Sequence, residues 1–152
     1  MARGLRNNNP GNIRLGSFKY RGEVAKSSDK AFRQFESMAW GYRAMFVLLH
    51  TYALRHRCRT LRDYISRYAP PSENNTEAYI RRVARATHLS DSDRLDTLSK
   101  PMMVQVVAAM SEVENGVPAN LHEVVDGWEL FYADFGINSY LCSRICIFHG
   151  RT

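Results

Sequence analysis

Hydrophobic and polar residues follow two different periods along this chain. In the first 38 residues, two short runs, 17–21 (SFKYR) and 31–35 (AFRQF), alternate aromatic with polar side chains. A period of two is typical of a half-buried strand. The polar loop 22–30 separates the two runs, so this part of the pattern predicts a small antiparallel β-hairpin near the N-terminus.

After the second run, apolar residues recur at spacings of three and four, which is typical of amphipathic helices. The first helix is predicted over about 39–55. The second begins after Thr60, because Asp63 stands at the capping-box position three residues later, and it ends at Pro70-Pro71.

Four more helix starts follow. The third is predicted at Asn74, and a short fourth at Ser90. The fifth has Pro101 in its first turn and ends at Gly116, a residue typical of the position after a helix, and the sixth begins at Asn120. The predicted fold class is therefore α+β and mostly helical, with the helices segregated from one N-terminal hairpin.

Composition supports one globular domain with an anionic partner. The chain has 152 residues, of which 45% are apolar, and this apolar content argues against disorder. The formal charge of +6 suits nucleic acid, an acidic polymer or a membrane surface. No run of apolar residues is long enough for a membrane span, and the N-terminus lacks the apolar segment of a signal peptide.

Cysteine and histidine positions predict neither a disulfide scaffold nor a cofactor. Cys58, Cys142 and Cys146 are odd in number and lack a framework spacing. Cys142 and Cys146, with His149, are either part of a metal site or apolar filler. Because the chain has no zinc-finger spacing and no HExxH pair, no metal is expected.

Glu114 is the strongest candidate for acid–base chemistry. It follows an apolar helix face and stands just before Gly116. Burial and the negative end of a helix dipole both raise a carboxyl pKa, as a glycosidase general acid requires. The alternative is a solvated Glu at a frayed helix end. Glu23 and Asp29 in the predicted hairpin are candidates for a second carboxylate, or else solvated loop residues.

The loop 7–14 (NNNPGNIR) is the second candidate feature. Either it presents Asn12 and Arg14 to a polar ligand, or its amides satisfy local backbone groups. The arginine clusters at 55–59 and 81–85 are candidates for a nucleic-acid surface or for solvated helix faces.

Three blocks, residues 3–14, 32–52 and 60–83, resemble a family of small phage and prophage proteins. Many of these proteins are labelled virion structural proteins, and a lysozyme-like fold is suspected for them. The resemblance spans residues 3–118. It implies a lysozyme-like domain over 1–118, with 119–152 as a helical extension that packs on it.

The chain also resembles the peptidoglycan glucosaminidases of the flagellar type. Residues 12–14 (NIR) are similar to their Asn-rich turn, 32–37 (FRQFES) to a segment after their hairpin, and 108–116 (AAMSEVENG) to their catalytic helix. In those enzymes the catalytic helix precedes the turn, so the order here implies a circular permutation.

On this resemblance Glu114 is the general acid and Glu23 the second carboxylate. The residues expected to bind the glycan are Asn9, Asn12, Arg14 and Tyr79.

The leading hypothesis is a peptidoglycan-cleaving glycosidase of phage or prophage origin, of the lysozyme or lytic transglycosylase type. It is expected to be a monomer, made in the bacterial cytoplasm without a signal peptide, which acts at the cell wall or within a virion. The alternatives are a non-enzymatic virion structural or wall-binding protein on the same fold, and a basic DNA-binding accessory protein. On the leading hypothesis peptidoglycan is the partner, with no specific nucleic acid and no cofactor.

Overall fold

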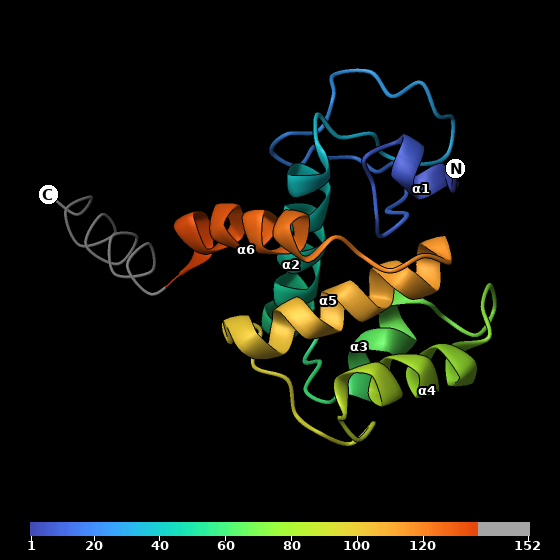
Figure 1. The fold of residues 1–152 in the computed structure, drawn as a ribbon, viewed down its shortest axis with the longest axis vertical. Coiled ribbons are helices and arrows are strands. Elements are labelled where there is room, and N and C mark those ends of the chain that lie inside the picture. Colours follow the sequence, from blue (N-terminus) through green and yellow to red (C-terminus); the bar gives the residue numbers. More distant parts are fainter. Residues whose placement is uncertain (137–152) are drawn as a thin grey trace, which may run out of the picture.

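The computed structural model describes residues 1–136 of the chain, and this part is mostly helical, as predicted (Figure 1). None of its helices combines the length and apolar character that crossing a membrane requires. The helices are α1 (Arg3–Arg6), α2 (Met38–Arg55), α3 (Leu61–Tyr68), α4 (Thr76–Thr87), α5 (Lys100–Asn115) and α6 (Leu121–Phe135).

The core forms where α6 packs against α2, with α5 and the α3–α4 pair beside them (Figure 1). Gly127 permits the close approach, because a Cβ atom there would lie 2.6 Å from Cβ of Tyr42 and 2.9 Å from the Ala39 carbonyl. The rings of Phe46 and Trp128 meet edge to face at 5.1 Å. The helix predicted for the C-terminal extension therefore contributes side chains to the main core.

Most helix ends follow local signals in the sequence. Thr60 and Asp63 form the predicted capping box of α3, and Asn120 caps α6. Gly116 ends α5 in the left-handed conformation, with φ of +73°. The cap of α4 is Asn75, one residue after the predicted start.

The short helix predicted at Ser90 is wrong. The backbone N–H of Ser90 donates a hydrogen bond to Oδ2 of Asp93 at 2.7 Å. The backbone N–H of Asp93 donates to the Ser90 carbonyl at 3.1 Å, and together these bonds close a turn. The Asp93 carbonyl then accepts from the N–H of Leu61 at 3.0 Å. The backbone groups of this segment thus pair with the start of α3 instead of forming a helix.

The predicted β-hairpin is also wrong, and residues 1–136 contain no regular strand. The backbone of 31–36 forms hydrogen bonds with two different segments of the chain. The N–H of Arg33 donates to the Ile13 carbonyl, and the Gln34 carbonyl accepts from the N–H of Val24, each at 2.9 Å. A polar residue of these runs, Arg33, is buried, whereas an aromatic one, Phe18, is 56% exposed. The alternation of aromatic and polar residues therefore does not correspond to a buried and an exposed face of a strand. Only isolated antiparallel bridges form here, Arg14 with Phe32 and Glu23 with Phe35.

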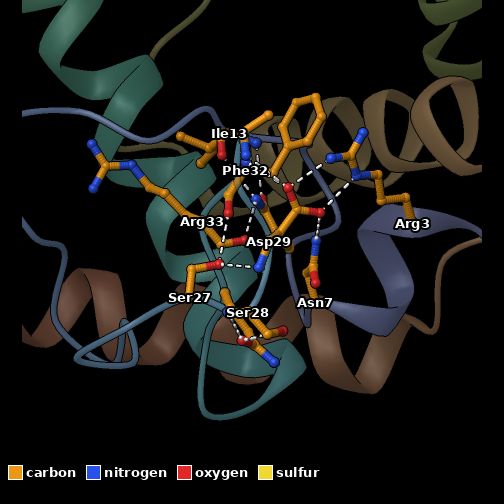
Figure 2. A network of polar contacts seen from close by, with 11 residues as sticks. Arg3, Asn7, Ile13, Ser27, Ser28, Asp29, Phe32 and Arg33 are labelled. Carbon is orange, nitrogen blue, oxygen red and sulfur yellow. Dashed lines mark hydrogen bonds and ion pairs between the residues drawn. The ribbon is translucent and has the colours of Figure 1, made fainter.

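A network around Asp29 fixes this N-terminal segment instead (Figure 2). Arg3 donates to both Asp29 carboxylate oxygens, at 2.6 and 2.7 Å, and Asn7 donates at 3.0 Å. The backbone N–H groups of Ala31 and Phe32 donate to the same carboxylate at 2.9 and 3.0 Å. The hydrogen bond from Arg3, with these backbone bonds, holds the pKa of Asp29 far below its ordinary value. The network joins α1 to the segment that carries Phe32.

Candidate active site

A cleft of about 410 Å³ lies beside the C-terminal end of α5. Its walls come from α1, the 7–14 loop, the 31–36 segment, α2, α3, the segment between α3 and α4, and α5. Two carboxylates line it, Glu114 and Glu73. The complete lining is Arg3, Gly11, Asn12, Ile13, Arg14, Phe32, Leu48, Tyr52, Tyr68, Ala69, Glu73, Asn74 and Glu114.

Glu114 stands in the last turn of α5 and is half-buried. Its Oε2 accepts a hydrogen bond from Nδ2 of Asn12 at 3.0 Å, and its Oε1 accepts one from the hydroxyl of Tyr79 at 3.2 Å. Burial raises the pKa of Glu114, although the hydrogen bonds from Asn12 and Tyr79 act in the opposite direction. The negative end of the α5 dipole also favours the protonated form. This carboxyl therefore holds its proton to a higher pH than an ordinary Glu.

The 7–14 loop is built around Asn9, which is fully buried. Nδ2 of Asn9 donates to the carbonyls of Ile13 and Arg33, and its Oδ1 accepts from the N–H of Ile13, all at 2.9 Å. Asn9 was predicted to bind the glycan, but its side chain lies inside the loop and does not line the cleft. Asn12 has a φ of +48°, a conformation that Asn tolerates better than most residues.

Two further side chains fasten this loop to the helices. Nδ2 of Asn115 donates to the carbonyls of Pro10 and Ser111, both at 2.8 Å. The hydroxyl of Tyr68 donates to the Gly11 carbonyl. The loop is thus fixed to the end of α5 and to α3, so Asn12 reaches Glu114 from a rigid backbone.

Tyr79 lies behind Glu114 rather than on the cleft wall. It is 6% exposed and belongs to the core, and its hydroxyl also lies 3.5 Å from the Met110 carbonyl. Burial, together with the charge of Glu114, raises the pKa of Tyr79 well above its ordinary value, so the phenol keeps its proton. Tyr79 therefore orients Glu114 from α4.

Arg14 lies at the exposed rim of the cleft. Its guanidinium stands 5.1 Å from the ring centre of Phe32, and Arg3 stands 4.6 Å from the same ring. Nη2 of Arg14 is 3.7 Å from Oε2 of Glu73, and both side chains are more than half exposed. Arg14 and Phe32 thus present a cationic and aromatic surface to a ligand.

Glu23 does not line this cleft. Its side chain is 1% exposed and accepts from Nη1 of Arg33 at 2.7 Å and from the N–H of Tyr20 at 3.0 Å. The structure therefore pairs Glu23 with a buried arginine and does not bring it to Glu114. Glu23 was predicted to lie on a β-hairpin, and that hairpin does not form.

Glu73 is the cleft carboxylate that sequence analysis missed. It follows Pro70-Pro71 and precedes Asn74 and Asn75, in a segment that the pattern marks only as the break between two helices. Two prolines followed by a polar run that ends in a helix cap predict an ordered loop, and ordered loops often carry functional groups. That signal was available in the sequence.

No metal site is evident within residues 1–136, because no three His, Cys, Asp or Glu side chains there group closely enough to hold an ion. The partial site considered at Cys142, Cys146 and His149 lies outside the described residues.

The chain is similar to Protein P5 of Pseudoalteromonas phage PM2, with 38% identity over 132 residues. The alignment covers 84% of this chain and 81% of P5. The chain belongs to the P5 family. The sequence resemblance to phage proteins is confirmed at this level. No family model matches the chain.

Proposed function

We propose that this member of the P5 family is a peptidoglycan-cleaving glycosidase with Glu114 as its general acid. The observation that carries the proposal is the state of Glu114. It is a carboxyl with a raised pKa, held by two hydrogen-bond donors, at a cleft whose volume lies within the range of about 300–1,000 Å³ typical of ligand sites.

The contacts of Glu114 suit proton donation. As the glycosidic bond breaks, the leaving oxygen takes a proton from Glu114, and positive charge develops on the sugar. Glu114 then becomes a carboxylate. Asn12 and Tyr79 both donate to it, so they stabilise the charge that forms during the reaction. Water or the 6-hydroxyl of the substrate completes the reaction, as in a lysozyme or a lytic transglycosylase respectively.

A lysozyme-like, circularly permuted fold belongs to this proposal. In the flagellar-type glucosaminidases, the catalytic helix comes just before the Asn-rich turn. Here Asn12 and Glu114 are 102 residues apart in sequence but in hydrogen-bond contact. A permutation of the chain order would preserve this contact while changing the connection. The helical content of residues 1–136 is compatible with such a core.

The surface charge fits a site of action at the bacterial wall. A formal charge of +6 attracts the protein to the carboxylates and attached anionic polymers of peptidoglycan. Arg14 and Phe32 at the cleft rim offer contacts for a polar ring with anionic substituents. We propose that the protein acts there as a monomer, either free or as part of a virion.

The test compares wild type, Glu114→Gln and a matched control, Glu112→Gln, by the loss of turbidity of a purified peptidoglycan suspension. Glu112 is exposed on the same helix, two residues earlier. Wild type and Glu112→Gln are expected to clear the suspension, and Glu114→Gln is expected to lose at least about 100-fold in rate. Equal clearing by Glu114→Gln would refute the role of the acid. Binding without clearing by wild type would favour the non-enzymatic wall-binding alternative.

A further inference from the structure

We propose that Glu73 is the second catalytic carboxylate of the cleft and acts as the base that activates water. This inference rests on the proposed glycosidase function. It makes the protein a hydrolase rather than a transglycosylase, and it assigns to Glu73 the role that sequence analysis gave to Glu23.

Glu73 lines the same cleft as Glu114 but comes from a different element, the segment 69–75 between α3 and α4. Two local hydrogen bonds close this segment into a loop. The Glu73 N–H donates to the Pro70 carbonyl at 3.1 Å, and Oγ1 of Thr76 donates to the Ala69 carbonyl at 2.6 Å. The carboxylate therefore stands on an ordered support.

The environments of the two cleft carboxylates differ in the way that acid and base roles require. Glu114 is half-buried, and burial favours its protonated form. The side chain of Glu73 is 58% exposed, so water reaches it directly. Glycosidases place one carboxyl in a dry pocket as the acid and leave the other accessible as the base or nucleophile.

Arg14 forms an ion pair with Glu73 but no hydrogen bond, so the carboxylate oxygens stay free to accept a proton from water. The separation of 3.7 Å between Nη2 of Arg14 and Oε2 of Glu73 is longer than a hydrogen bond, so the cation faces the carboxylate loosely. Glu23 offers the contrast: it is 1% exposed and bonded to Arg33 at 2.7 Å. A carboxylate held like Glu23 has no access to the water that a hydrolase must activate.

In the proposed step, Glu73 accepts a proton from water as the water oxygen bonds to the anomeric carbon. The bond from that carbon to the glycosidic oxygen breaks, and Glu114 gives its proton to this oxygen. One water is consumed, and Glu73 then returns its proton through solvent while Glu114 takes one up. Attack from the face opposite the leaving group inverts the anomeric centre, so a β-linked chain yields an α-anomer.

The experiment uses the full chain and purified peptidoglycan, with wild type, Glu73→Gln, Glu73→Ala and the control Glu129→Gln. Glu129 is as exposed as Glu73, at 60%, and also faces a cation, Lys100 at 2.6 Å, but it lies on α6 outside the cleft. The readouts are new reducing ends, the anomer formed first, and cleavage by Glu73→Ala with added sodium azide. Azide is a nucleophile that needs no base.

Wild type and Glu129→Gln are expected to release reducing ends as the α-anomer. Both Glu73 variants are expected to lose about 100- to 10,000-fold in rate, and azide is expected to restore cleavage by Glu73→Ala with formation of an α-glycosyl azide. Near-wild-type cleavage by Glu73→Gln, a 1,6-anhydro product from wild type, or no rescue by azide would each overturn the proposal. In those cases the glycosidase function would stand, whereas no cleavage by wild type would remove both.

Discussion

Replacing Asn9 by Ala separates a structural role for this residue from the binding role that its sequence context predicts. Asn9 is fully buried and bonds three backbone groups, which belong to Ile13 and Arg33. Removal of the amide leaves the N–H of Ile13 and the carbonyl of Arg33 without these bonds. The Ile13 carbonyl keeps its second partner, because the N–H of Arg33 also donates to it, at 2.9 Å.

The expected loss of stability follows from these two groups. A buried polar group left without a partner costs about 1–3 kcal/mol, so Asn9→Ala is expected to lower the free energy of unfolding by about 2–6 kcal/mol. A domain of this size has about 5–15 kcal/mol in total, so the variant loses a large share of it. At about 2–4 °C per kcal/mol, the melting temperature falls by roughly 4–24 °C.

Urea unfolding followed by circular dichroism measures this loss. The matched control is Asn120→Ala, in which an exposed Asn caps α6 and bonds backbone N–H groups at one helix end. Loss of such a cap costs about 1 kcal/mol. If Asn9→Ala were no more destabilising than Asn120→Ala, the claim that Asn9 holds the loop together would be refuted.

Two further predictions concern pH. In Asn12→Gly, loss of the hydrogen bond that lowers the Glu114 pKa should move the alkaline limb of kcat/KM to higher pH, while glycine accepts the φ of +48°. The control Asn8→Gly, at a φ of +49°, should leave the limb in place, and an unmoved limb in Asn12→Gly would contradict the assignment. The folded-state pKa of Asp29 is below its unfolded value, so its stabilisation is present above about pH 4 and is lost as pH falls. Asp29→Asn should therefore destabilise the protein at pH 7, and the difference from wild type in urea unfolding should shrink toward pH 3; a difference independent of pH would count against the network.

Local signals predicted the parts of the fold that depend on near neighbours in sequence. The helix ends show this best. Each hydrogen bond that caps a helix at Thr60, Gly116 or Asn120 joins residues no more than four apart, so the sequence around each of them predicts its role. The same holds for Glu114, whose place at the end of an apolar helix face follows from the position of Gly116.

Contacts between residues far apart in sequence determine the features that the sequence did not predict. The alternating pattern predicts that Arg33 faces outward from a strand. Instead its guanidinium is buried, where it bonds the Glu23 carboxylate and the carbonyls of Arg14 and Phe18. That pairing removes Glu23 from the candidate site. The proline pair and the polar run after it predict an ordered loop at 70–75. Glu73 joins the site only because α3 and α5 both contact the 7–14 loop, and that long-range contact has no local signal in the sequence.

The most direct test of the central claim measures new glycan ends by mass spectrometry while binding to sedimented peptidoglycan is followed in parallel. If Glu114 is the general acid, wild type produces new ends, and Glu114→Gln binds peptidoglycan equally well but produces at least about 100-fold fewer. Glycan ends formed by Glu114→Gln at the wild-type rate would contradict the account.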